Sequence, residues 1–156
     1  EKIPWIPTGY YISEDAPASR HPYYAAGLYY LQEPSAMTPA NLLPIEPGDR
    51  VLDLCAAPGG KALHMAELLQ GTGHVEARDL TDYKVNLIQD NIMRSGMNNI
   101  EAVRWDATVL DEASVEKADI VIADLPCSGL GVLGKKTDLK YKTSEEIQKS
   151  LPDEES

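Results

Sequence analysis

The stretch DLCAAPGGKA, residues 53–62, decides the fold of this chain. It ends the short apolar run RVLDL (50–54) and leads into KALHMAELLQ (61–70). The apolar residues of that second run recur at helical spacing; they are Leu63, Met65, Ala66 and Leu69. A buried strand, a glycine turn and a helix in this order are typical of the first βα unit of a parallel sheet. We therefore expect the turn to lie at the carboxyl end of a strand and to hold a ligand.

The same alternation continues along the chain. HVEARD (74–79) is a second predicted strand, DYKVNLIQDNIMRSG (82–96) a helix that a glycine ends, and NIEAVRWD (99–106) a third strand. KADIVIADLPC (117–127) is a fourth strand, whose unbroken apolar centre predicts burial on both faces. This order predicts a doubly wound, Rossmann-like α/β fold with a mostly parallel sheet and helices on both of its faces.

Three other segments lack this alternation. Residues 1–33 hold six of the eight tyrosines without helical or strand period, so we expect an irregular remnant of an upstream region. PSAMTPANLL (34–43) predicts a helix capped by Ser35. Residues 143–156 are polar and acidic and predict a solvated tail.

Composition and charge limit the classes of protein to which this chain can belong. A chain of 156 residues, 43% of them hydrophobic, is long enough for one domain with its own core. The chain has 14 basic and 25 acidic residues and a net charge of -11. This charge argues against non-specific electrostatic binding to nucleic-acid phosphates. No apolar run approaches the roughly 18 residues of a membrane span, and the first residues lack the features of a signal peptide. We expect a cytoplasmic protein that does not bind a membrane.

Histidines and cysteines point away from metal and disulfide chemistry. The three histidines lack the spacing of metal ligands, so no metal is expected. Cys55 and Cys127 could form one bridge, but each directly follows a strand-like run, where active-site residues of α/β folds emerge. Free thiols in a reducing compartment are the favoured interpretation.

The ends of the four predicted strands carry the candidate site. A glycine turn that opens a helix directs backbone N–H groups at an anion, and this turn lacks both the P-loop and the GxGxxG patterns. Asp79 ends the second strand, where an acid accepts hydrogen bonds from ribose hydroxyls, and Asp106 after the third could receive an exocyclic amine. A cation such as Lys61 at a helix start is unfavourable, because it opposes the helix dipole. A ligand carboxylate that pairs with Lys61 is the favoured explanation for its presence there. Adenosine with an anionic tail fits, and S-adenosylmethionine is such a molecule.

Three motifs carry a family resemblance. GLYYLQEPSAM (27–37), VLDLCAAPGGKA (51–62) and ADLPCSGLGV (123–132) resemble, in order and spacing, the motifs of the Sun/Fmu-type RNA (cytosine-5) methyltransferases. The resemblance covers about residues 21–142 and makes 34–142 the S-adenosylmethionine-binding core. It implies an enzyme that forms 5-methylcytosine in ribosomal or transfer RNA.

The resemblance also implies roles for individual residues. Asp79 would hold the ribose of S-adenosylmethionine, Asp106 its adenine end, and Asp124 its methionine amino group or the target base. Cys127 matches the motif-four cysteine of the family, with a catalytic role in product release. The methionine part of the cofactor would lie against one loop, formed by Cys55, Ala56, Ala57, Pro58, Gly59, Gly60 and Lys61.

The chain departs from the family at the nucleophile. Family members carry a later TC motif whose cysteine adds to cytosine C6, so that C5 can attack the methyl group, and no such cysteine follows Cys127 here. The base must be unpaired or flipped for this attack. We therefore expect a fragment that lacks the C-terminal strands and RNA-contacting segments and is inactive alone. Two alternatives stay open: a DNA-type cytosine-5 methyltransferase with Cys127 as nucleophile, and a non-catalytic S-adenosylmethionine-binding module.

Overall fold

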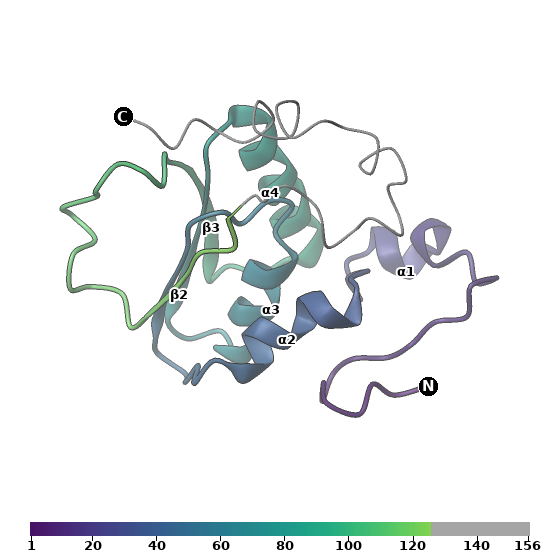
Figure 1. Cartoon of the computed structure of the whole chain (residues 1–156). Coiled ribbons are helices and arrows are strands. Elements are labelled where there is room, and N and C mark those ends of the chain that lie inside the picture. The colour runs from purple at the N-terminus through teal and green to yellow at the C-terminus, as the bar shows by residue number, and fades with distance from the viewer. Residues whose placement is uncertain (126–156) are drawn as a thin grey trace, which may run out of the picture. The chain divides into compact units, whose positions relative to one another are not determined.

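The computed structural model describes residues 1–125 and has a parallel four-stranded sheet at its centre (Figure 1). The strands are β1 (Arg50–Asp53), β2 (His74–Asp79), β3 (Ile100–Arg104) and β4 (Ile120–Ile122). They lie in the order β3-β2-β1-β4, and all three pairs are parallel. The strand order therefore reverses at β1, which has β2 on one side and β4 on the other. Open α/β sheets bind ligands at such a switch point, outside the carboxyl ends of the strands.

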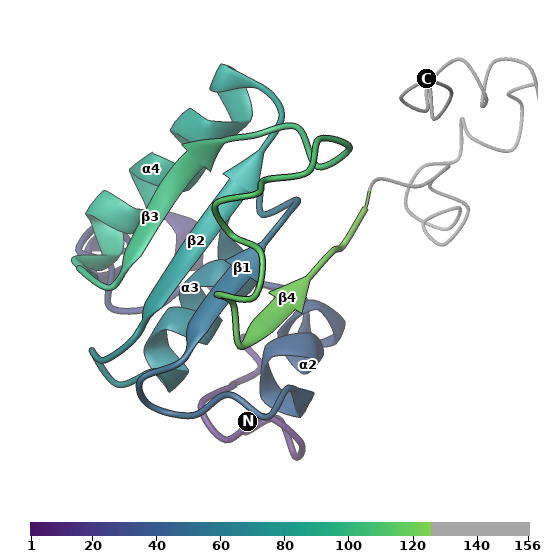
Figure 2. The same ribbon diagram turned by 90° about the vertical axis from the view of Figure 1, so that its left-hand side faces the viewer.

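Three helices cover one face of this sheet (Figures 1 and 2). They are α2 (Pro34–Leu42), α3 (Gly60–Leu68) and α4 (Asp82–Ser95). The core between helices and sheet contains side chains that are nearly inaccessible to solvent, among them Val51, Val75, Ala77, Ala40, Leu63, Met65, Leu69 and Ile88. The faces of α3 and α4 that the spacing of apolar residues predicted to be buried pack into this core. Gly96 ends α4, as predicted, in a left-handed conformation with φ 69° that favours glycine.

The opposite face of the sheet carries no helix among residues 1–125. Residues 105–119, which connect β3 to β4, cross it as a chain of turns (Figure 2). The side chains of Asp106 and Asp111 accept hydrogen bonds from the backbone two residues onward, Thr108 N and Ala113 N, and such bonds compete with helix formation. The prediction of helices on both faces therefore fails in this part of the chain.

The fourth strand is shorter and more exposed than predicted. Strand β4 has three residues, and its middle side chain, Val121, is 55% exposed. Ile120 and Ile122 point to the helix side and pack with the core. The prediction of burial on both faces was wrong for Val121, because side chains alternate along a strand and no described helix covers its side.

The N-terminal segment is irregular, as predicted, but it is anchored. It contains one bridge between Lys2 and Tyr10, a 3-10 turn (Ala18–Arg20) and the short helix α1 (Pro22–Ala25). Ile3 and Ile6 are each 1% exposed. Residues Glu1–Asp124 form one compact unit.

Helix α2 begins two residues earlier than a cap at Ser35 would place it. Pro34 is its first residue and Glu33 its N-cap, so the prediction that Ser35 caps it was wrong. Proline is favoured at the first helical position, because its missing N–H would have no partner there anyway. Among residues 1–125, none of the helices has the length and apolar content that a bilayer crossing requires.

Candidate functional site

The glycine loop leaves β1 at the switch point of the sheet. Its backbone is bound to both neighbouring strands, since Leu54 N donates to Ile122 O (3.0 Å) and Ala56 N donates to Arg78 O (2.8 Å). Gly59 is the N-cap of α3 with φ 109°, a conformation that side chains disfavour. No side chain of the described residues caps the start of this helix. Its first N–H groups and the positive end of its dipole are thus available to an anionic ligand group.

Gly60 joins two of the three motifs in space. A Cβ atom on this glycine would lie 2.8 Å from Tyr30 Cε1 and 3.1 Å from Gln32 Nε2, closer than packing allows. The segment that contains GLYYLQE therefore packs directly on the glycine loop, and Gln32 Nε2 also donates to Ala36 O of α2 (3.0 Å). The first motif supports the shape of the second.

Asp79 ends β2 with its carboxylate turned into the structure, and 3% of the residue is exposed. Its Oδ2 accepts a hydrogen bond from Ala57 N (3.1 Å), and its Oδ1 accepts one from Leu80 N (2.8 Å). Lys84 Nζ lies 3.0 Å from Oδ1. A carboxylate has about four acceptor positions, so Asp79 holds the loop and retains capacity for a further donor. Lys84 was not among the predicted site residues, although its place in the first turn of the helix after Asp79 was a signal.

Asp53 is more deeply buried and less well paired. The residue is 1% exposed, its Oδ1 accepts a long hydrogen bond from Cys55 N (3.4 Å), and its Oδ2 has no partner among the described residues. Burial raises the pKa of Asp53 to about 6, although the hydrogen bond from Cys55 N and the positive charge of Lys61 both lower it. A buried oxygen without a donor is costly to the folded state. The site therefore suits a ligand that brings a cation or a hydrogen-bond donor.

Lys61 and Asp124 link the two sides of the switch point. Lys61 Nζ in the first turn of α3 lies 2.5 Å from Asp124 Oδ2, just after β4. A ligand carboxylate was the predicted partner of Lys61, and the structure shows a carboxylate of the chain itself in that place. The Asp124 side chain is 56% exposed, so this carboxylate is held in place and still accessible.

Asp106 lies close to the end of β2, because Trp105 N donates to Asp79 O (3.0 Å). Its Oδ1 accepts hydrogen bonds from Thr108 N (2.9 Å) and Thr108 Oγ1 (2.7 Å), which lower its pKa and keep it ionised at neutral pH. Together Asp53, Asp79 and Asp106 make the carboxyl edge strongly acidic.

The cysteines and the remaining loop residues complete the list of candidates. Cys55 is half-buried with a free thiol, and burial raises its pKa, so it stays protonated and unreactive. Ala56, Ala57 and Pro58 lie in the loop beside it, with Pro58 O accepting a hydrogen bond from Asn91 of α4 (2.8 Å). Cys127 lies outside the described residues. Residues 1–125 contain no group of histidines, cysteines and acids that could hold a metal ion.

One cavity of the described part lies away from these acids. It has a volume of about 450 Å³ and is bounded by the N-terminal segment, residues 27–32, α3 and the end of α4. Gly60 is the only one of the predicted site residues on its wall. The candidate site is therefore defined by the chemistry of its residues and its place in the sheet, and not by this cavity.

Two family models match the chain. Residues 40–155 match 16S rRNA methyltransferase RsmB/F, and residues 1–34 match the N-terminal domain of 16S rRNA methyltransferase RsmF. The ribosomal RNA small subunit methyltransferase F of Serratia proteamaculans is 34% identical over 98% of this chain and 33% of its own length. The 26S rRNA (cytosine-C(5))-methyltransferase nsun-1 of Caenorhabditis elegans is 33% identical over 93% of this chain and 22% of its own. The chain thus spans a third or less of these relatives.

Two solved structures superpose on this chain over most of its length. PH0851 superposes with a TM-score of 0.78 at 28% identity, over 96% of this chain and 34% of its own. NSun6 from Pyrococcus horikoshii, solved with SFG, superposes with a TM-score of 0.74 at 31% identity, over 85% of this chain and 34% of its own.

Proposed function

Because this chain belongs to the 16S rRNA methyltransferase RsmB/F family, we propose that it is the cofactor-binding part of an S-adenosylmethionine-dependent enzyme that forms 5-methylcytosine in ribosomal RNA. The family resemblance and the Rossmann-like methyltransferase fold predicted from the sequence are both confirmed. A cytoplasmic location and the choice of ribosomal over transfer RNA are parts of the proposal.

One observation carries the proposal: buried carboxylates and an uncapped helix start meet at the switch point of the sheet. Asp79 retains acceptor capacity for ribose hydroxyls, and Asp53 Oδ2 has no donor in the described part of the chain. The loop from Cys55 to Lys61 would lie along the methionine part, with Asp106 near adenine. These residues fit S-adenosylmethionine, and NSun6 was solved with its analogue SFG. The cofactor supplies an electrophilic methyl group when bound.

Asp124 is the residue of the described part best placed to act on the base. Its carboxylate is held by Lys61 and is 56% exposed, so an incoming cytosine has access to it. Acting as an acid near N3 of the ring, it would donate a proton that neutralises the negative charge developing on the ring when a thiolate adds to C6. We assign the thiolate to a cysteine of the protein outside this chain and product release to Cys127.

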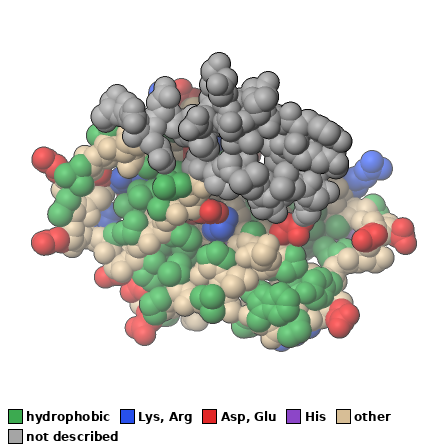
Figure 3. Space-filling model, in the orientation of Figure 1, with side chains coloured by type: hydrophobic (Ala, Val, Ile, Leu, Met, Phe, Trp, Pro, Cys, Tyr) green, Lys and Arg blue, Asp and Glu red, His purple; other side chains and the backbone are tan. Residues whose placement is uncertain are grey.

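RNA binding is assigned mainly to other parts of the protein. The chain has a net charge of -11, and the face in Figure 3 carries acidic side chains around its margin. Few phosphates can be neutralised by such a surface, so the described part would bind RNA weakly and in a salt-dependent way.

The direct test is methyl transfer by the full-length protein. The protein is incubated with S-adenosylmethionine labelled in the methyl group and, in separate reactions, with unmodified 16S rRNA or with unmethylated DNA, and the nucleic acid is digested to nucleosides. The proposal predicts label in 5-methylcytidine. Label in DNA but not RNA would favour the DNA-type alternative, and cofactor binding without any transfer would favour a non-catalytic binding module.

A further inference from the structure

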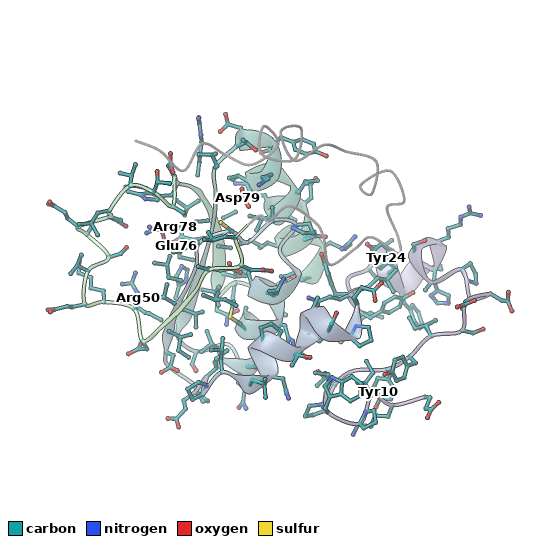
Figure 4. All side chains as sticks on the ribbon, viewed as in Figure 1. Tyr10, Tyr24, Arg50, Glu76, Arg78 and Asp79 are labelled. Atoms are coloured by element: carbon teal, nitrogen blue, oxygen red, sulfur yellow. The ribbon has the colours of Figure 1, made fainter. Side chains whose placement is uncertain are left out.

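Arg78 is a buried cation on the sheet face that carries no described helix. Its side chain is 4% exposed and points from β2 toward the connection 105–119, beside Glu76 (Figure 4). Arg78 Nε donates to Glu76 Oε1 (2.5 Å), and Nη2 donates to Asp111 Oδ2 (2.5 Å) and to Ser114 Oγ (2.9 Å). One guanidinium thus binds a neighbour on its own strand and two residues of the connection.

Arg78 also contacts the beginning of the same connection. Its Cζ lies 5.0 Å from the ring centroid of Trp105, in the range of a cation–π interaction. Trp105 is fixed in turn by hydrogen bonds from its backbone N to Asp79 O (3.0 Å) and from its ring Nε1 to Val109 O (2.9 Å). Asp106 follows Trp105 directly. Arg78 therefore influences the position of Asp106 through Trp105.

Apolar packing contributes little to holding this connection. Its larger aliphatic side chains are all more than half exposed; they are Val109, Leu110 and Val115. Charge-assisted hydrogen bonds are about twice as strong as neutral ones, and a planar guanidinium fixes the direction of several at once. A segment with few buried apolar contacts opens easily unless such bonds hold it.

We propose that Arg78 is a positioning residue that gives the cofactor site its preference for adenine. By holding Trp105, Asp111 and Ser114 against the sheet, Arg78 keeps Asp106 where its carboxylate accepts a hydrogen bond from the exocyclic amine of adenine. The inference rests on the proposed function, since it concerns the same cofactor.

The test compares two nucleoside ligands on the full-length protein by calorimetry. S-adenosylhomocysteine has the exocyclic amine, and S-inosylhomocysteine has a carbonyl oxygen in its place, which an acidic acceptor repels. The wild type is expected to prefer the adenosyl ligand by about tenfold to a hundredfold. Arg78→Met and Asp106→Ala should both reduce this preference to less than about threefold while binding of the inosyl ligand persists. Arg78→Lys, which keeps the charge without the planar fork, should lie between.

Matched variants separate positioning from general stability. Arg104→Met removes another arginine of the same sheet, whose side chain is 64% exposed and pairs with Asp82, and it should leave the preference unchanged. Hydrogen exchange without ligand should rise in peptides from 105–119 in Arg78→Met and stay unchanged in peptides from α3. If Arg78→Met does not fold, Asp111→Asn weakens the same contact from the connection and should have the same effects.

The results distinguish a failure of the inference about Arg78 from a failure of the proposed function. Full adenosyl preference in a folded Arg78→Met, or an equal loss of affinity for both ligands, would overturn the inference and leave the proposed function standing. If the wild type bound neither ligand, the proposed function would fail, and the inference with it.

Discussion

Replacing Asp53 with asparagine should remove a pH-dependent penalty from the folded state. Burial raises the pKa of this carboxyl from 3.8 to about 6, so between these pH values the folded protein holds a proton that the unfolded chain has lost. The free energy of unfolding therefore falls as the pH rises through this window. Each pKa unit corresponds to about 1.4 kcal/mol, so the wild type loses about 3 kcal/mol by neutral pH relative to acid. Asparagine has a similar shape and does not titrate.

The comparison of interest is the pH slope of wild type against variant, because the other acids contribute equally to both. Between about pH 4.5 and pH 7.5, Asp53→Asn should gain about 2 kcal/mol on the wild type, since part of the titration lies below this range. Unfolding of the full-length protein in urea is followed by hydrogen exchange of peptides from β1 and β2, which reports on this unit alone. Asp90→Asn, at an exposed position of α4, controls for the loss of one charge. Parallel slopes for wild type and Asp53→Asn would refute the reasoning.

Three further changes test other parts of the site. Gly60→Ala places a Cβ 2.8 Å from Tyr30 Cε1 and should lower the free energy of unfolding by about 1–3 kcal/mol in urea; unchanged stability would contradict the packing of the two motifs. Lys61→Met removes the ion pair with Asp124 and should change stability by about 1 kcal/mol or less while it slows methyl transfer by about tenfold or more. Equal rates would show that Asp124 needs no support from Lys61. Cys127→Ala should accumulate a covalent protein–RNA complex on denaturing gels, because product release is impaired, whereas alanine at the downstream cysteine should give none; the reverse pattern would make Cys127 the nucleophile.

The alternation of apolar runs predicted most of the sheet from the sequence. Strand β2 was predicted with its observed bounds, and helix α4 was predicted to within one residue. Both elements bury one side along most of their length, so apolar residues recur regularly in their sequences. The connection 105–119 could not be predicted in the same way, because side-chain hydrogen bonds of Asp106 and Asp111 determine its turns.

The candidate site residues could be proposed from the sequence, whereas the partners that they have in the structure could not. The motifs identified Asp79 and Lys61, since these follow directly from strand ends and a glycine turn. That Lys61 pairs with Asp124 depends on the placement of β4 beside β1, and this pairing has no local signal in the sequence. The same holds for Arg78, an inconspicuous residue of β2 whose neighbours Asp111 and Ser114 come from more than 30 positions onward.

Calorimetry of S-adenosylhomocysteine binding to the full-length protein tests the central claim, that the carboxyl edge of this sheet holds the cofactor. The wild type should bind, and Asp79→Ala should weaken binding by about tenfold to a hundredfold, because charge-assisted hydrogen bonds to the ribose are worth about 1.5–3 kcal/mol. The control is Asp82→Ala, the next acid along the chain, whose side chain is 76% exposed. It should bind as the wild type does. Equal affinity of Asp79→Ala and the wild type would contradict the account, since the cofactor would then lie elsewhere.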